Sequence, residues 1–331
     1  MKIFISHKTS PYYNLSIEEL MAQDEQIKGD ILYLYQHDNA VIIGRNQNAH
    51  EEIKRDYVEE NKIELARRLS GGGAVYHDLG NINFSFITDY DHKGGYERFL
   101  APIIDYLNSL GLKAEFKGRN DLLCNGAKIS GNAQYIKGNR IVSHGTLLFD
   151  VDLTKLSNAL NPSKLKIESK GIQSARQRVT NIAKELNYSL STNEFINKLV
   201  EYFVQNDHGQ IEEIPVERYK IEKNLDNLIA FRKTDEWIYG KNPKFSFENA
   251  AKFPNGILKI KANVEKDKFT EVYFEGDFLA KKELNDSNIY QLFKGLSFTR
   301  ESVAKVLEQI DLDMYFGGIS KEEILSLFFP S

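Results

Sequence analysis

The chain has 331 residues, of which 41% are hydrophobic and 27% are charged, and its formal net charge is −4 at pH 7. This length favours two domains, and the composition is typical of a globular protein with a large core. The negative net charge argues against bulk nucleic-acid binding. The single cysteine, Cys124, excludes an intrachain disulfide and a cysteine-rich zinc cluster. The first 15 residues lack a signal-peptide core, and no run approaches a membrane span, so we expect a cytoplasmic protein without a membrane partner.

Strand-like and helix-like patterns alternate in the first 60 residues. Alternation predicts a strand at residues 1–6, and helical spacing predicts a helix over residues 14–27 with Asn14 as its N-cap. Residues 31–35 and 40–43 are β-rich and separated by four polar residues, so we predict a hairpin. A short charged helix is expected at residues 54–60. The polar residues 44–48 fit either a ligand-contacting loop or a plain surface loop.

A glycine-rich stretch over residues 67–88 is the most informative segment. Gly71, Gly72 and Gly73 follow the pair Arg67-Arg68, and glycine lets backbone N–H groups approach a ligand closely. Residues 74–77 and 83–87 read as two strands joined by a turn at residues 78–81, which predicts a hairpin. The pattern fits a plain glycine-rich hairpin or an anion-binding loop. The arginines and the nearby polar residues favour the anion-binding loop.

The segment from residue 95 to 149 predicts a second wall for the same site. Its first part, residues 95–110, has one apolar helical face, and Gly111 stands where a C-terminal cap belongs. Three antiparallel strands are expected at residues 121–124, 128–136 and 140–149, because Asn-Gly and Gly-Asn pairs separate them. Lys128 follows the first turn directly. Taken alone, Lys128 fits a solvated lysine and His144 a structural histidine, but together they indicate a site.

Residues 161–181 break the β pattern with five basic residues, Lys164, Lys166, Lys170, Arg176 and Arg178, against the single acidic Glu168. Such a loop either closes over a nucleotide phosphate or is a solvated surface loop. Helices are predicted at residues 192–206 and 225–237, and the break at residues 240–244 is the expected domain boundary. Beyond it we expect strands at residues 256–264 and 269–275, followed by helices at residues 287–295, 300–309 and 320–329.

Several common chemistries lack their motifs here. No GK[ST] follows the glycines, and the glycines lead into a predicted hairpin instead of the helix of a dinucleotide fold. The seven histidines show no metal-ligand spacing, so we expect no resident metal and no permanently bound cofactor. Two glycine-bearing walls with a lysine and several arginines suit the activation of a carboxylate by ATP. That reaction brings two anions together and needs fixed positive charge and backbone donors.

The same residues carry a family resemblance. The chain resembles the lipoate–protein ligases in RRLSGGGAVYHDLGN (67–81), GRND (118–121), AKISGNA (127–133), HGTLLFDVDL (144–153), KGIQSARQRVTN (170–181) and GRNQN (44–48). The resemblance covers nearly all of residues 1–240 with the motifs in order, and it extends more loosely to the C-terminal segment.

This resemblance implies an α+β fold of mixed, largely antiparallel sheets with packed helices, shared with biotin protein ligases, and a small α+β C-terminal domain. It implies a catalytic domain at residues 1–240, a linker at 241–248 and an accessory domain at 249–331. The implied reaction joins lipoate and ATP into lipoyl-adenylate and pyrophosphate, with Mg²⁺ entering as part of the ATP complex. The lipoyl group then passes to a lysine of an apo-lipoyl domain of a 2-oxoacid dehydrogenase complex or of the glycine cleavage H protein. We expect a monomer.

The resemblance also implies roles for individual residues. Lys128 is the implied catalytic residue, and Asp121 the implied Mg²⁺ ligand. The implied ATP and adenylate site consists of Arg68, Gly73, Ala74, Val75, Tyr76, Asp121, Lys128, Lys170 and Arg178. The implied lipoate site consists of Ser70, Gly72, Gly73, Val75, His77, Lys128, His144 and Gly145. For His77 and Asn81, bracing of the loop and contact with the ligand are both open.

Three alternatives stay open. Acyltransferases of the same fold use a cysteine nucleophile, for which Cys124 is the candidate, although its apolar Leu-Leu-Cys setting favours a structural role. A biotin protein ligase fits less well, because the GRGRxGR-type loop of that family is absent. A non-enzymatic binding module for acyl groups or nucleotides is the third alternative.

Overall fold

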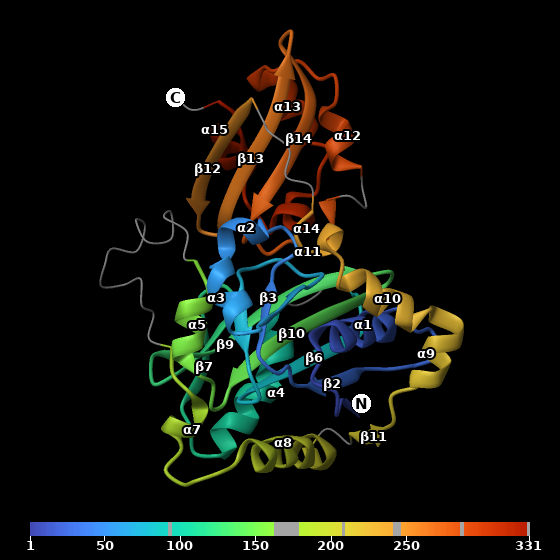
Figure 1. The fold of residues 1–331 in the computed structure, drawn as a ribbon, viewed down its shortest axis with the longest axis vertical. Coiled ribbons are helices and arrows are strands. Elements are labelled where there is room, and N and C mark those ends of the chain that lie inside the picture. Colours follow the sequence, from blue (N-terminus) through green and yellow to red (C-terminus); the bar gives the residue numbers. More distant parts are fainter. Residues whose placement is uncertain (92–94, 162–178, 207–208, 241–245, 285–287, 330–331) are drawn as a thin grey trace.

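The computed structural model describes residues 1–91, 95–161, 179–206, 209–240, 246–284 and 288–329. Within these residues the chain forms an eight-stranded sheet, two three-stranded sheets and helices that pack on them (Figure 1). The eight-stranded sheet and one small sheet belong to the larger part of the molecule, which ends near residue 240. The third sheet belongs to a smaller part that stands on the first. The basic segment at residues 162–178, including Lys170 and Arg178, lies outside the described residues.

The eight-stranded sheet is the frame of the larger part. Its strands, in spatial order, are β11 (Gln210–Glu212), β1 (Lys2–Ile5), β2 (Ile31–Tyr35), β6 (Asn81–Asp89), β10 (Arg140–Leu148), β9 (Ala127–Lys137), β8 (Asp121–Cys124) and β7 (Ala114–Lys117). Strand β1 pairs parallel with β11 and β2, and every other neighbour pair is antiparallel. The expected mixed, largely antiparallel sheet is therefore confirmed.

Helices bury both faces of this sheet, as the sequence of β2 illustrates. Alternate residues of a strand point to opposite faces. Leu32 and Leu34 join the core under α4 (Tyr96–Ser109) and α8 (Thr192–Asn206). Ile31, Tyr33 and Tyr35 face α1 (Pro11–Ala22), α9 (Val216–Lys223) and α10 (Leu225–Arg232) on the other side. Because both faces are covered, the whole strand is apolar or aromatic.

The second sheet of the larger part has the order β4 (Glu64–Arg67), β3 (Ala40–Ile43), β5 (Val75–His77). The short helices of this part are α2 (Ala49–Glu52), α3 (Arg55–Glu60), α5 (Leu153–Ala159), α7 (Ile182–Glu185) and α11 (Asp235–Ile238). A core that includes Val41, Ile43, Tyr76 and Val58 lies between this sheet and its helices.

Both hairpins predicted in the first 90 residues are wrong. Strand β2 belongs to the large sheet, whereas β3 pairs parallel with β4 and antiparallel with β5 in the small one. In the same way β5 and β6 lie in different sheets, and residues 78–80 carry the chain from one to the other. A local β pattern identifies a strand but not its partner, because non-local pairing is decided by the packing of the whole domain.

Two predicted helices differ in their limits. Helix α1 begins at Pro11 with Ser10 as the N-cap residue, because proline suits the first helical position. Asn14 is not a cap: its side-chain amide donates to the carbonyl oxygens of Lys8 and Gln36, and the helix ends at Ala22. The helix expected at residues 225–237 is divided into α10 and α11. The division falls where the side chain of Thr234 caps α11.

The smaller part has its own core. Its sheet is a meander of β12 (Phe247–Phe253), β13 (Gly256–Glu265) and β14 (Lys268–Gly276). Its helices are α12 (Ile289–Phe293), α13 (Arg300–Leu307), α14 (Leu312–Phe316) and α15 (Lys321–Phe328). The expectation of a small α+β C-terminal domain is confirmed, while β12 was not predicted and begins inside the range expected to be a linker. A capping box of Ser320 and Glu323 starts α15.

Residues 276–283 of the smaller part make hydrogen bonds and an ion pair with the larger part. The N–H of Gly276 donates to the carbonyl of Asn46 at 2.7 Å, and the N–H of Ile136 donates to the carbonyl of Lys281 at 2.7 Å. Arg45 forms a two-pronged ion pair with Glu283. These contacts bring the smaller part directly onto the loop that follows β3 and onto strand β9.

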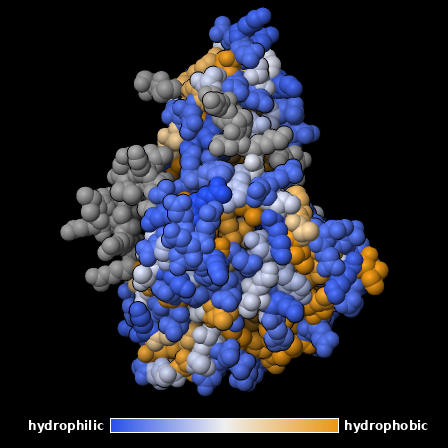
Figure 2. Space-filling view, in the orientation of Figure 1, coloured by the Kyte–Doolittle hydropathy of each residue, from blue (hydrophilic) through white to orange (hydrophobic). Residues whose placement is uncertain are grey.

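The surface is mainly hydrophilic on the face shown in Figure 2, and hydrophobic residues are more numerous over the larger part. Among the described residues, no helix combines the length and the apolar composition that a membrane crossing requires.

Candidate active site

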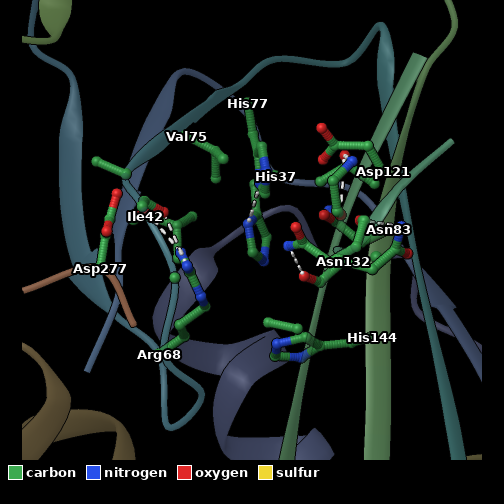
Figure 3. Close-up of a pocket in the computed structure, with 18 of the residues that line it drawn as sticks. His37, Ile42, Arg68, Val75, His77, Asn83, Asp121, Asn132, His144 and Asp277 are labelled. Atoms are coloured by element: carbon green, nitrogen blue, oxygen red, sulfur yellow. Dashed lines mark hydrogen bonds between the residues drawn. The ribbon is translucent and has the colours of Figure 1, made fainter. Parts of the chain in front are cut away.

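A cavity of about 350 Å³ lies between α1, the large sheet and the small sheet of the larger part. Figure 3 shows side chains from several strands converging on it, and Asp277 reaching it from the smaller part. Its wall consists of Leu15, Tyr35, His37, Ile42, Arg68, Gly72, Gly73, Ala74, Val75, His77, Asn83, Arg119, Asn120, Asp121, Lys128, Gly131, Asn132, Ala133, His144, Gly145, Thr146 and Asp277. The size suits a small ligand.

The strand β6 explains why polar side chains face this cavity from inside the fold. Ile82, Phe84 and Phe86 point into the core under α4 and α8. The residues between them, Asn83 and Ser85, point to the opposite face, although both are buried. Buried polar positions on one face of an otherwise apolar strand are costly unless they are paired or functional. This alternation is the sequence signal that marks the site.

The loop at residues 68–74, between β4 and β5, is called the glycine loop here, and it packs tightly against the backbone of other segments. A Cβ on Gly71 would lie 2.2 Å from the carbonyl oxygen of Phe278, and a Cβ on Gly44 would lie 2.0 Å from that of Gly72. Gly72 also has φ +89°, a conformation that glycine adopts without strain. Its N–H donates to the carbonyl of Phe278 at 3.2 Å. The glycines therefore allow the loop to sit beneath the smaller part.

Arg68 holds this loop in shape. Its Nη2 donates to the carbonyls of Gly71 and Gly73 at 2.7 and 2.8 Å, its Nη1 to that of Ile42 at 3.1 Å, and its Nε to Ser70 Oγ at 3.1 Å. Burial lowers the pKa of Arg68 to about 10, so the guanidinium stays charged at neutral pH. Arg68 therefore fixes the loop with hydrogen bonds and adds positive charge to the cavity wall.

A chain of buried hydrogen bonds runs from Arg68 to α1. Ser70 Oγ lies 2.6 Å from His144 Nε2, and His144 Nδ1 lies 3.0 Å from a carboxylate oxygen of Glu18. Arg68 Nε donates to Ser70 Oγ, and the two ring nitrogens of His144 bridge the Ser70 hydroxyl and the Glu18 carboxylate. These hydrogen bonds link Arg68 and its loop to the carboxylate of Glu18 on α1.

Glu18 receives three further hydroxyl donors, from Tyr35, Tyr135 and Ser85. Its side chain is 2% exposed. Burial acts to raise the pKa of Glu18, but His144 and the hydroxyl donors outweigh burial and lower it below its usual range. An ionised Glu18 therefore anchors the chain that ends at the glycine loop.

Two further histidines, His37 and His77, form a buried pair in the cavity wall. Their Nδ1 atoms lie 3.1 Å apart, so one ring donates and the other accepts, and two neutral rings must take opposite tautomers. Figure 3 shows this contact beside Val75. Burial lowers the pKa of His37 to about 3, and burial together with His37 lowers that of His77 well below its ordinary value. Both rings are neutral at physiological pH.

This pair predicts acid sensitivity. The unfolded chain takes up a proton at His37 as the pH falls through about 6.5, while the folded chain resists protonation down to about pH 3, so stability is lost as the pH falls. We expect His37→Gln to reduce the loss of unfolding free energy between pH 7 and pH 5 by up to about 2 kcal/mol. Urea titrations at both pH values measure it, with His7→Gln as the exposed control. Parallel pH curves for His37→Gln and wild type would contradict the assignment.

Lys128 stands on the opposite wall from the glycine loop. It is the second residue of β9, and its Nζ lies 2.7 Å from Asp121 Oδ1 on the neighbouring strand β8. A Cβ on Gly131 would lie 3.2 Å from this Nζ, so glycine leaves room for the ammonium group. The carbonyl of Lys128 accepts from the N–H of Thr180, which joins β9 to the chain just beyond the undescribed basic segment.

The structure brings most of the predicted site residues to one cavity. Arg68, Gly72, Gly73, Ala74, Val75, His77, Asp121, Lys128, His144 and Gly145 all line it. Two predicted residues do not: Ser70 is buried between Arg68 and His144, and Tyr76 points into the core on the far side of β5. Asn81 is also buried outside the lining, where its amide donates to Asn83.

The residues of the site and its support that the sequence did not predict include Glu18, His37, Arg119 and Asp277. In the sequence, Glu18 looks like a surface residue of an amphipathic helix. It is buried because it lies on the side of α1 that packs against the large sheet. Asp277 reaches the cavity from the smaller part of the chain, more than 130 residues after His144. For Arg119, the family resemblance of the GRND segment implied no role.

Cys124 lies away from the cavity. Its side chain is fully buried in the core on the α4 side of the large sheet. Burial raises the pKa of its thiol, which makes the thiolate needed for nucleophilic attack less accessible.

Asp121 in the cavity wall suits a magnesium ion that is bound to a nucleotide. In the described part of the chain, no cluster of three or more histidine, cysteine, aspartate or glutamate side chains is arranged to hold a metal. Mg²⁺ bound to ATP needs only one or two protein carboxylates, because phosphate and water supply its other ligands. Asp121, in the cavity wall beside Lys128, fits that requirement.

Comparisons with known proteins agree with this architecture. A family model described as "Lipoyl protein ligase A/B catalytic domain" matches residues 10–204, and one described as "Bacterial lipoate protein ligase C-terminus" matches residues 242–328. Lipoate-protein ligase LplJ of Bacillus subtilis is 42% identical over 99% of this chain and 100% of its own length.

Two solved structures are similar. That of LipL1 of P. falciparum in complex with lipoate has a TM-score of 0.78 over 94% of each chain at 24% identity, which shows a shared fold. A lipoate-protein ligase A bound with ATP has a TM-score of 0.59 at 28% identity, covering 72% of this chain and 98% of its own.

Fold, cavity and family matches together define a ligase with a catalytic part and a smaller C-terminal part. Both family models and the full-length match to the Bacillus relative point to one group of such ligases. The chain belongs to the lipoate–protein ligase family.

Proposed function

We propose that this enzyme uses ATP to activate free lipoate as lipoyl-adenylate and then transfers the lipoyl group to a lysine of an acceptor protein. The observation that carries the proposal is the single cavity that joins the glycine loop, Lys128 and Asp121 to an apolar wall at Leu15, Ile42 and Val75. A carboxylate and a phosphate fit beside the charged wall, and an acyl chain fits beside the apolar one.

In the first step a carboxylate oxygen of lipoate attacks the α-phosphorus of ATP, and pyrophosphate leaves. Arg68 and Lys128 reduce the repulsion between the two anions, while the backbone of Gly73 to Val75 positions the adenylate. In the second step the acceptor amine attacks the acyl carbonyl. Lys128 then donates a hydrogen bond to the oxyanion, and AMP leaves. Asp121 orients Lys128 and contacts Mg²⁺.

The remaining roles follow from position. His77, His144 and Gly145 line the lipoyl group together with Gly72 and Val75, whereas Ser70 and Tyr76 act indirectly, by holding the loop and the small sheet. Lys170 and Arg178, in the undescribed basic segment, contact the adenylate. Residues 1–240 form the catalytic domain, and the C-terminal domain starts with β12 at Phe247, inside the range expected to be a linker.

The acceptors we propose are apo-lipoyl domains of 2-oxoacid dehydrogenase complexes and the apo-H protein of glycine cleavage. The enzyme acts as a cytoplasmic monomer. To test the function, the purified protein is incubated with lipoate, MgATP and each apo-acceptor in turn, and the intact mass of the acceptor is recorded. A gain of one lipoyl group that requires both lipoate and ATP supports the proposal. Tight lipoate binding with no mass gain on any acceptor would instead indicate a binding module.

Replacement of Cys124 separates the ligase from a thioester-forming acyltransferase. Because the cysteine is buried in the core away from the cavity, we expect Cys124→Ala to retain ATP-dependent transfer of free lipoate within about threefold of wild type. Its stability is expected to fall by about 1 kcal/mol through loss of packing. Transfer rates and thermal melts measure the two effects. An inactive variant with a wild-type melting curve would favour the thioester route.

A further inference from the structure

Arg119 carries a buried donor that the described chain leaves unused. The residue lies in the turn between β7 and β8, and its side chain lines the cavity. Its Nη1 atom is buried, and no acceptor in the described residues contacts it. A buried guanidinium N–H without an acceptor is costly, so its retention in a cavity wall indicates a ligand that supplies the missing acceptor.

The turn that carries Arg119 is held firmly in place. The side-chain amide of Asn120 donates to the carbonyl of Asn132 at 2.5 Å, and that of Asn132 donates to the carbonyl of Asn120 at 3.0 Å. The backbone N–H of Asn132 also donates to the carbonyl of Asn120 at 3.0 Å. These bonds lock the turn to β9, the strand that carries Lys128. The two cations are therefore fixed relative to one another before any ligand binds.

The cationic side chains of the cavity wall differ in how many of their hydrogen-bond donors already have an acceptor. Arg68 already donates to three backbone carbonyls and Ser70, and Lys128 is paired with Asp121. Arg119 Nη1 instead lies 3.0 Å from the position that a Cβ on Gly256 would take, directly under the smaller part of the chain. Arg119 therefore lines the cavity and also contacts the smaller part, which contributes Asp277 to the same lining.

We propose that Arg119 binds the β- and γ-phosphates of ATP, the portion that leaves as pyrophosphate. This rests on the proposed function. As the carboxylate oxygen of lipoate bonds to the α-phosphorus, the bond from that phosphorus to the bridging oxygen breaks, and pyrophosphate takes the electron pair. Negative charge rises on the leaving phosphates, and an arginine fork bonds phosphate oxygens well. In the proposed function Lys128 binds the acyl carbonyl and the α-phosphate. Arg119 is therefore the cation that binds the β- and γ-phosphates.

The two half-reactions test this assignment, because pyrophosphate takes part only in the first. For Arg119→Gln we expect kcat/KM for lipoate-dependent pyrophosphate release from MgATP to fall by roughly 10²-fold. Transfer from chemically prepared lipoyl-adenylate to an apo-lipoyl domain changes by less than about twofold. Arg119→Lys recovers part of the first rate, since it restores the charge without the fork. Arg55→Gln, at an exposed arginine on α3, is the matched control.

Equal losses in both half-reactions would overturn the inference, since the residue would then support the fold or contact the AMP portion. An unchanged rate of pyrophosphate release in Arg119→Gln would also overturn it. If wild-type protein itself releases no pyrophosphate with lipoate and MgATP, the proposed function fails instead. Should Arg119→Gln melt well below wild type, the comparison of half-reactions is made with Arg119→Lys, where selective loss of the first supports the inference and equal loss opposes it.

Discussion

Lys128→Ala is expected to abolish lipoyl transfer while leaving the fold intact. The Lys128 side chain is 29% exposed in the cavity wall, so truncation removes little packing. It does remove the cation that faces the carboxylate, the phosphate and the developing oxyanion. Loss of one such donor reduces kcat by roughly 10²- to 10³-fold, and here the same group serves both steps. Transfer rates and adenylate formation are to be measured by mass spectrometry, beside circular dichroism of the folded protein.

The control for this prediction is Lys198→Ala, which removes an exposed lysine of α8 far from the cavity. Wild-type activity in the control together with inactivity in Lys128→Ala supports the assignment. Normal formation of lipoyl-adenylate by Lys128→Ala would sink it, because the ammonium would then have no part in activation.

Glu18→Ala is expected to have the second largest effect, on stability and activity together. The substitution leaves His144 Nδ1 and the hydroxyls of Tyr35, Tyr135 and Ser85 without their shared acceptor in a buried site. We expect the free energy of unfolding to fall by about 3 kcal/mol or more. The same series of hydrogen bonds, from Glu18 through His144, also supports Ser70 and the glycine loop. We therefore expect kcat/KM for lipoate to fall by roughly 10- to 100-fold.

Glu18→Gln separates the two effects. It keeps the volume and an acceptor oxygen, so most of the stability returns, but it removes the negative charge that orients His144. A KM for lipoate that rises in Glu18→Gln at nearly wild-type stability supports a positioning role. Kinetic constants unchanged in Glu18→Gln would show that Glu18 only stabilises the fold.

Local signals predicted some elements and not their partners. The strands at residues 121–149 were found because Asn125-Gly126 and Gly138-Asn139 fix tight turns between them, and both glycines have positive φ. The pairing of β3 with β4 and β5 escaped prediction. Neighbouring β segments favour a hairpin by sequence alone, whereas here the chain crosses between two sheets. The misplaced start of α1 has a local cause, since Pro11 marked the first turn and Asn14 was read as a cap.

The site was predictable where its residues carry their own signal. Lys128 follows a turn, and the glycines lie beside two arginines, so both walls were found from sequence. Glu18 and Asp277 carry no such signal, because a glutamate in a helix and an aspartate after a strand are common on surfaces. Their importance comes from burial and from contacts across long sequence separations. The role of Arg68 was also incompletely predicted, since its donors hold the loop that was expected to bind the anion.

We propose that one cavity activates lipoate with ATP before any acceptor is present. This proposal is tested most directly by mixing purified protein with lipoate and MgATP, without acceptor, and measuring pyrophosphate and enzyme-bound products. We predict a burst of about one pyrophosphate per enzyme that requires both substrates, with lipoyl-adenylate recovered from the protein. Pyrophosphate release that does not depend on lipoate, or a lipoyl group found covalently on Cys124, would contradict the account.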